Sequence, residues 1–224
     1  MLEKNSGILN SIRKNWQSFT FLLVILLIYI FIVSPFPDKG FLGRLLFLFF
    51  YLLFLSSGIN LLNKKRKTGI FLFFIIAPFL ILLADIFFNL PRLVLGADLF
   101  IIIYCIWLGS IILRRTFFKG HITVHRIEGA IIVYLLTALI FALLYHIIFL
   151  LYGQSAFKGL IHYERSEFMY FSLTTLTTVG YGDITPVNQF ARSLANLEAL
   201  NGQLYPAILI ARLVSMEFTT SKNQ

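Results

Sequence analysis

Long apolar runs alternate with short polar connections along the chain. Six of these runs approach the ~20 apolar residues that a helix needs to cross the hydrocarbon core of a bilayer. They lie at about residues 18–34, 41–62, 68–90, 93–113, 127–152 and 191–216. Because a spanning backbone must satisfy its hydrogen bonds internally, the pattern predicts an all-α integral membrane protein with six transmembrane helices.

The connection between the fifth and sixth runs departs from this alternation. It is too polar and too rich in glycine to span a bilayer. Non-helical backbone at membrane depth is tolerated only where protein or water covers it. We therefore expect this segment to re-enter the membrane and to be shielded from lipid by protein.

Composition agrees with a lipid environment. Of the 224 residues, 58% are hydrophobic and only 13% are charged, more apolar surface than a soluble domain of this length can bury. The net charge of +9 comes from short basic runs beside the apolar segments, which is typical of topology determinants and not of a nucleic-acid-binding face. Cys105 is the only cysteine, so neither an intrachain disulfide nor a cysteine metal site is expected.

The basic residues also predict an orientation. With six spans and the N-terminus inside, 13 of the 19 Lys and Arg residues fall on the inner side, as the positive-inside rule favours. Residues 1–17 and 218–224 are then cytosolic tails, and residues 114–126 form an inner interfacial linker. The first run follows a long polar tail without a small-residue cleavage site, so we expect an uncleaved first span in the plasma membrane.

The re-entrant connection contains the sequence Thr177-Thr178-Val179-Gly180-Tyr181-Gly182-Asp183. Gly180 and Gly182 lack a Cβ and allow backbone angles at which neighbouring carbonyls can face the same way. Thr178 adds a hydroxyl at the inner end, and Asp183 places a carboxylate at the outer end. The segment resembles a potassium selectivity filter.

One such segment cannot surround an ion, and the chain contains no internal repeat, so four copies must converge as a homotetramer. Together with its span order, the chain resembles the tetrameric six-span potassium channels of the voltage-gated-like superfamily. The close resemblance covers about residues 127–216. It implies a pore domain at 127–217 beside a four-helix peripheral domain at 18–113. It also implies that K⁺ binds without a cofactor, at the backbone carbonyls of Thr178, Val179, Gly180 and Tyr181.

The resemblance further implies a short pore helix before the filter, at residues 167–177. Ser166 is the residue type expected to cap its N-terminus. Tyr170 falls where relatives often place a tryptophan that bonds to the aspartate of the filter. We therefore predict that Tyr170 braces the filter through Asp183.

Two departures from the family bear on gating. The fourth run has no basic residue between Leu93 and Leu113, and Arg114 and Arg115 follow it. Steep voltage gating needs several charges per subunit, because each contributes only ~2.3 kcal/mol per 100 mV. Weak or absent voltage dependence is expected. No soluble ligand-binding domain fits within these residues.

The last run contains polar residues that need an explanation. Glu198 either lines the water-filled cavity, concentrating cations, or bonds to groups behind the filter. Gly202 and Pro206 are candidates for a bend and a gate, since glycine weakens a helix and proline removes a backbone hydrogen bond.

Other ionisable residues receive structural interpretations. Asp85 and Asp98 are expected to form a paired cluster near Arg92. The four histidines show no metal-ligand spacing and are expected to pack or be solvated; they are His121, His125, His146 and His162. No nucleophile lies near a matching base, so no enzyme is indicated.

The sequence thus predicts passive, potassium-selective conduction. Two alternatives stay open. One is a weakly selective cation channel, because the conformation of a filter also decides its selectivity. The other is a non-conducting membrane scaffold or modulatory subunit.

Overall fold

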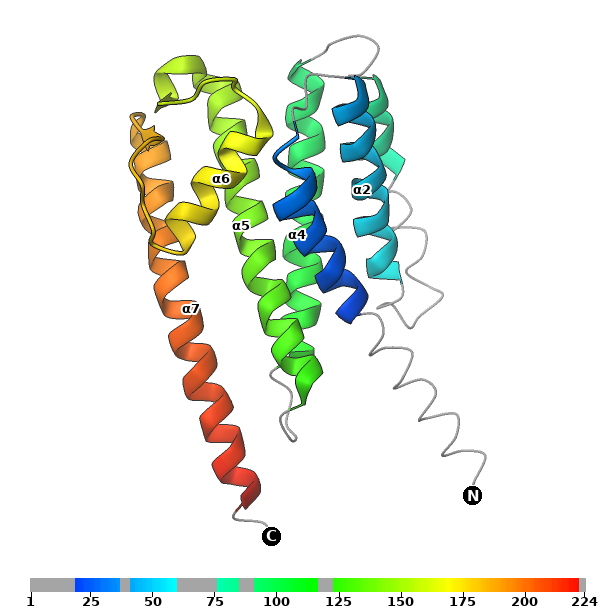
Figure 1. Cartoon of the computed structure of the whole chain (residues 1–224), viewed down its shortest axis with the longest axis vertical. Coiled ribbons are helices and arrows are strands. Elements are labelled where there is room, and N and C mark those ends of the chain that lie inside the picture. Colours follow the sequence, from blue (N-terminus) through cyan, green and yellow to red (C-terminus); the bar gives the residue numbers. More distant parts are fainter. Residues whose placement is uncertain (1–18, 37–40, 60–75, 85–90, 117–122, 222–224) are drawn as a thin grey trace.

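The structure is a computed structural model that describes residues 19–36, 41–59, 76–84, 91–116 and 123–221. Nearly all of these residues are helical (Figure 1). Residues 19–28 and 76–84 are helical, and the first of these segments continues into the π-helix η1. The remaining elements are η1 (Tyr29–Val33), α2 (Phe41–Ile59), α4 (Pro91–Thr116), α5 (Val124–Tyr152), η3 (Gly153–Ala156), β1 (Phe157–Lys158), α6 (Arg165–Leu176), β2 (Thr185–Pro186) and α7 (Gln189–Ser221).

Two helices of the described part are long and apolar enough to cross a membrane, Leu93–Thr116 and Val124–Ala156. Phe19–Val33 and Leu45–Ser56 are shorter apolar helices. Of the predicted third span, 68–90, only residues 76–84 are described. The helix α7 covers the predicted sixth span, but its sequence is diluted by polar residues such as Glu198 and Gln203. The protein is mostly helical, with a membrane-spanning character that rests on α4 and α5.

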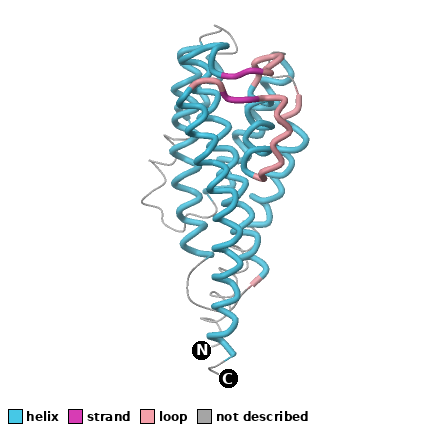
Figure 2. The backbone as a smooth tube through the Cα atoms, turned by 90° about the vertical axis from the view of Figure 1, so that its left-hand side faces the viewer, coloured by secondary structure: helices cyan, strands magenta, loops and turns pink. Residues whose placement is uncertain are grey.

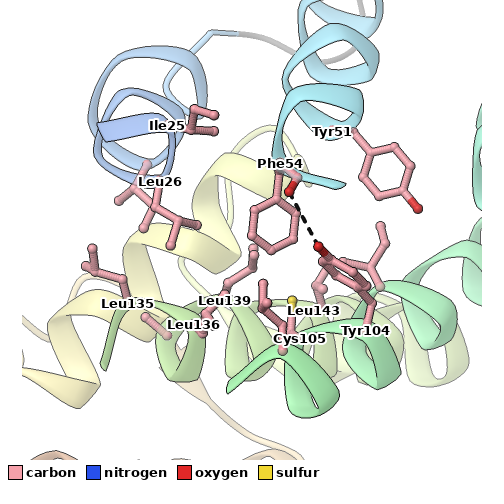
Figure 3. Close-up of a cluster of buried hydrophobic side chains, with 14 of the residues drawn as sticks. Ile25, Leu26, Tyr51, Phe54, Tyr104, Cys105, Leu135, Leu136, Leu139 and Leu143 are labelled. Atoms are coloured by element: carbon pink, nitrogen blue, oxygen red, sulfur yellow. Dashed lines mark hydrogen bonds between the residues drawn. The ribbon is translucent and has the colours of Figure 1, made fainter. Parts of the chain in front are cut away.

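The largest core joins α4, α5 and the N-terminal helices. Figure 3 shows Cys105 of α4, Leu139 of α5 and Leu26 of the first helix converging in this core. The hydroxyl of Tyr104 is directed at the carbonyl oxygens of Leu55, at 3.3 Å, and Phe54, at 3.5 Å. Its buried polar atom is thereby satisfied, as low-dielectric surroundings require.

A second core lies behind α6 and consists mainly of aromatic rings. Tyr145 of α5 contacts Phe171 of α6 edge-on, with ring centroids 4.8 Å apart. Phe157 contacts both Phe168 and Phe171 of α6. These contacts hold the short helix α6 against α5.

A two-stranded antiparallel sheet joins the two sides of the connection between α5 and α7 (Figure 2). Phe157 pairs with Pro186, and Lys158 pairs with Thr185. At the next residue, Gly159, φ is +93° and an added Cβ would lie 1.8 Å from the carbonyl oxygen of Asp183. Only glycine permits this approach, which fixes the end of the 177–183 segment.

The boundaries of the short helix and of the linker differ from the sequence prediction. The short helix begins at Arg165, and its N-cap is Glu164 in place of the predicted Ser166. Glu164 and Glu167 form a reciprocal capping box that the sequence analysis missed, because a glutamate is a less usual N-cap than a serine. The helix α4 extends to Thr116 and α5 starts at Val124, which shortens the predicted linker 114–126.

Candidate functional site

The segment Thr177–Asp183 leaves the C-terminal end of α6 without regular secondary structure. Its backbone takes positive φ at every second residue, namely 60° at Thr178, 54° at Gly180 and 79° at Gly182. In a β-strand, successive residues face opposite sides. Alternating the backbone handedness turns successive peptide planes the other way, so that neighbouring carbonyls can share one side. The two glycines allow this at little cost.

Thr178 is not a glycine and is β-branched, so its positive φ costs about 1–3 kcal/mol. Two hydrogen bonds constrain it. Its N–H donates to the carbonyl of Thr175 at 3.0 Å, and its Oγ1 accepts from Gln203 Nε2 at 3.2 Å. Gly180 N–H adds a bond to the carbonyl of Thr174 at 3.1 Å. The segment is folded back on the end of α6.

Gln203 was not predicted as a site residue. It lies on α7 and reaches the Thr178 hydroxyl across the chain. The sequence contains no signal that singles it out, because the final run contains other polar side chains, among them Asn196 and Asn201. Only the fold shows which residue the amide contacts.

The side chains of this segment are largely uncovered within one chain. Val179 is 53% exposed and Tyr181 is 72% exposed. An exposed apolar residue on a strained, constrained loop indicates a surface that meets something else.

The predicted contact between Tyr170 and Asp183 is present. Tyr170 Oη donates to Asp183 Oδ2 at 2.7 Å, and Asp183 Oδ1 accepts from the N–H of Ile184 at 3.0 Å. The rings of Tyr170 and Tyr181 stack with centroids 6.4 Å apart. The hydrogen bond from Tyr170 holds the pKa of Asp183 below its usual range, so this carboxylate keeps its negative charge. Whether Tyr170 braces a conducting filter stays a prediction.

The N-terminal end of α6 is fixed by Glu167. Its carboxylate accepts backbone N–H groups from Ile161 at 2.6 Å, His162 at 3.1 Å and Tyr163 at 2.6 Å. Burial raises the pKa of Glu167, but the backbone hydrogen bonds lower it by more, and the net pKa lies below the ordinary value.

A buried ionic cluster joins three helices beside the N-terminus of α6. Asp98 of α4 is fully buried; its Oδ2 lies 2.6 Å from His146 Nδ1, and its Oδ1 accepts from Arg165 Nη2 at 3.2 Å. The Arg165 guanidinium also lies over the ring of Phe47, 4.8 Å from its centroid. Asp98 is thus paired with His146 and Arg165, which the sequence did not indicate as its partners. Asp85 and the side chain of Arg92 lie outside the described residues.

Glu198 is fully buried by its own chain. Its carboxyl oxygens contact Tyr145 Oη at 2.6 Å and Ser172 Oγ at 2.5 Å. The interpretation that Glu198 lines a water-filled cavity is therefore contradicted by its position. The other interpretation, a carboxyl bonded behind the filter segment, agrees with these contacts.

Gly202 is a contact residue between α7 and α6. An added Cβ would lie 1.8 Å from the carbonyl oxygen of Leu176, the last residue of α6. The same carbonyl accepts from Tyr134 Oη at 3.2 Å. Pro206 lies inside α7, which is helical throughout. Close packing therefore accounts for Gly202 without a hinge, and a bend or gate at Gly202 and Pro206 stays a prediction.

The arrangement favours a hard cation over catalytic chemistry. The segment offers backbone carbonyls and hydroxyl oxygens next to a charged carboxylate, which are the ligands that alkali and other hard cations prefer. Among the residues that the structure describes, no group of three or more His, Cys, Asp or Glu side chains is placed to hold a metal ion.

Comparison with known proteins agrees with this chemistry. Residues 130–218 match the family model Ion_trans_2, described as an ion channel. Protein LctB of Geobacillus stearothermophilus is 48% identical over 46 residues, which cover 20% of this chain and 34% of that protein. Protein LctB of Bacillus caldotenax is 36% identical over 88 residues, 36% of this chain and 64% of that protein. The chain thus spans less than two thirds of the length of either relative. No solved structure matches it. The family match supports an ion channel.

Proposed function

We propose that the chain is one subunit of a homotetrameric channel that conducts K⁺ passively and selectively. The observation that carries the proposal is the alternating backbone of Thr178, Gly180 and Gly182, within the region that matches the ion-channel family. Carbonyl oxygens of Thr178, Val179, Gly180 and Tyr181, from four chains, would replace the hydration shell of the ion.

Assembly is supported by the apolar surface of α7. Four of its exposed side chains recur at intervals of three or four residues, as on one helix face. They are Leu197, Leu200, Leu204 and Ile208, with exposed fractions of 52%, 55%, 48% and 60%. Together with the exposed Val179, this apolar face favours subunit contact around a central axis.

The proposed orientation places α6 and the filter segment towards the outer face. Figure 1 shows the start of α5 and the end of α7 at one end of the molecule, with the connection between them at the other. Lys and Arg are in excess in the predicted inner segments. This excess supports a plasma-membrane protein in which the end with the start of α5 and the end of α7 faces the cytoplasm.

The test is flux of K⁺ into liposomes that contain the purified protein, with Na⁺ and Rb⁺ as competitors and Ba²⁺ as blocker. Gly180→Ala should abolish selective flux, because alanine is strained at φ +54°. Gly153→Ala is the matched control. Gly153 also has positive φ, +68°, and open space around it, but it lies at the end of α5. Alanine is strained at this position too, but the variant should keep its selectivity.

The outcomes separate the alternatives. Flux that does not distinguish K⁺ from Na⁺ would favour the weakly selective cation channel. An intact oligomer without flux, and with equal thermal stability in K⁺ and Na⁺, would favour the non-conducting scaffold or modulatory subunit. If Gly180→Ala and Gly153→Ala lost flux equally, the backbone of residues 178–182 would no longer support the proposal.

A further inference from the structure

Three helices meet at the carboxyl group of Glu198. The residue lies on α7, Tyr145 on α5 and Ser172 on α6, and all three side chains are completely buried. Neither hydrogen-bond partner of Glu198 is cationic. A buried carboxylate without a cation is strongly disfavoured, and such a group normally takes up a proton instead.

Counting the protons at this site leads to the same conclusion. The Tyr145 hydroxyl has one proton and donates it to Glu198 Oε2. The Ser172 hydroxyl also has one proton, but its oxygen lies 2.7 Å from the carbonyl of Ala138 and 2.5 Å from Glu198 Oε1. Both of these oxygens are acceptors if Glu198 is ionised, so one of the two short contacts would lack a proton.

A protonated Glu198 resolves this conflict. The acid donates from Oε1 to Ser172 Oγ, and Ser172 donates to the carbonyl of Ala138. Tyr145 donates to Oε2. Every short oxygen contact then has one donor and one acceptor.

We infer that Glu198 is a positioning residue, held as a neutral carboxylic acid that locks α6 between α5 and α7. Ser172 lies one helical turn before Leu176, the end of α6, from which the filter segment continues. We call the hydrogen-bonded group of Glu198, Tyr145 and Ser172 the clamp. The clamp therefore fixes the height and rotation of the segment that begins at Thr177. The effect on selectivity rests on the proposed function, but the protonation state of Glu198 does not.

The protonation state has a spectroscopic test. The infrared spectrum of the purified wild-type protein at neutral pH should contain the C=O stretch of a buried protonated carboxylic acid. The band should be absent in Glu198→Gln. It should remain in Glu128→Gln, the matched control on α5, where the carboxyl is not fully buried, lies 3.0 Å from His125 Nδ1 and accepts from the Thr20 hydroxyl at 3.0 Å. No such band in wild type, or a band that Glu198→Gln leaves unchanged, would overturn the inference whether or not the protein conducts.

The positioning role is tested by rescue. A glutamine can accept from Tyr145 with its carbonyl and donate to Ser172 with its amide, as the neutral acid does. Glu198→Gln should therefore keep the K⁺ over Na⁺ flux ratio of wild type. Glu198→Ala should lower the ratio by about tenfold, the effect of losing one to two net hydrogen bonds.

A second pair of variants serves if Glu198→Ala does not fold. Ser172→Ala and Tyr145→Phe each delete one hydroxyl from the clamp and should each lower the ratio by about two- to tenfold. A Glu198→Gln protein as impaired as Glu198→Ala would show that a charge is required and would refute the clamp. Wild-type selectivity in both Ser172→Ala and Tyr145→Phe would also refute the clamp. Absence of selective flux in wild type counts against the proposed function, and the infrared result then decides the inference.

Discussion

At the scale of single residues, Tyr170 and Asp183 form the contact that sets the charge at the outer end of the filter segment. The hydroxyl of Tyr170 stabilises the ionised carboxylate at 2.7 Å and so holds the pKa of Asp183 below its usual range. The negative charge attracts cations, and it persists until the pH falls through this lowered pKa.

Tyr170→Phe should shift the acid inhibition of flux to higher pH. Without the hydroxyl, the pKa of Asp183 rises towards its ordinary value, so the carboxylate is neutralised earlier as pH falls. The measurement is external pH titration of K⁺ flux. Asp183→Asn is the control, in which the Tyr170 substitution should no longer move the pH profile. An unchanged titration midpoint in Tyr170→Phe would refute the role of this hydrogen bond.

Gly202 gives a second prediction at this scale. Gly202→Ala should destabilise the protein by about 1–3 kcal/mol, as overpacking does, because the new Cβ meets the Leu176 carbonyl oxygen. Gly109→Ala is the control, since its Cβ would meet only Leu136 Cδ1 at 3.8 Å. Alanine also has the higher helix propensity, so this variant should be as stable as wild type or more so. Thermal unfolding of both variants is the measurement. A stable Gly202→Ala protein with altered open probability would favour the hinge instead.

At the scale of elements, α6 is held by contacts at its N-terminus, middle and C-terminus. Glu164 and Glu167 form the capping box at its N-terminus, its middle contacts Glu198 through Ser172, and its last carbonyl accepts from Tyr134. A helix of 12 residues is marginal by itself, so its position depends on these contacts.

Glu167→Gln should lower the free energy of unfolding by about 1 kcal/mol, a typical capping contribution. The stability of this variant should also fall less steeply than that of wild type as the pH becomes acidic. The lowered pKa means that the carboxylate contributes stability above its unfolded pKa and loses it as pH falls through the folded value. Thermal melting of wild type and Glu167→Gln across the acid range is the measurement. The two curves should converge at low pH. A constant difference at every pH would contradict this account of the cap.

The cluster around Asp98 connects α4 to both α5 and α6. Asp98→Asn should lower the free energy of unfolding by about 3–5 kcal/mol, because it leaves the charge of Arg165 without its buried carboxylate. Chemical denaturation is the measurement. A double variant with Arg165→Met should recover part of the loss, since both charges are then removed. No recovery would indicate that the His146 contact at 2.6 Å supplies most of the stability.

At the scale of the whole molecule, the peripheral helices lack the charges of a voltage sensor. Between Leu93 and Leu113, α4 contains no Lys or Arg. Its basic residues are Arg92 in the first turn and Arg114 and Arg115 in the last turn. The apolar core of Figure 3 joins this helix and α5 to the first helix and α2. The N-terminal helices therefore pack against α4 and α5 through apolar side chains.

Reconstituted protein should accordingly show weak voltage dependence, equivalent to less than about one charge per subunit, since each charge contributes only ~2.3 kcal/mol per 100 mV. Current recorded across planar bilayers over a range of voltages is the measurement. A steep activation curve that requires several charges per subunit would contradict the prediction.

The sequence by itself determined the helical membrane character and singled out the segment Thr177–Asp183. Both depend on local signals, the length of apolar runs and the glycine spacing of residues 180 and 182. The resemblance also placed Tyr170 opposite Asp183, at the position where relatives often have a tryptophan, and the hydrogen bond between them is present.

Only the tertiary structure decided which distant side chains meet. The partners of Asp98 lie 48 and 67 residues away, and Tyr145 lies 53 residues from Glu198. Sequence periodicity reports which face of a helix is apolar, but not which helix covers it. For that reason, only the fold showed that Glu198 is buried among α5, α6 and α7 and that Gly202 packs against the end of α6.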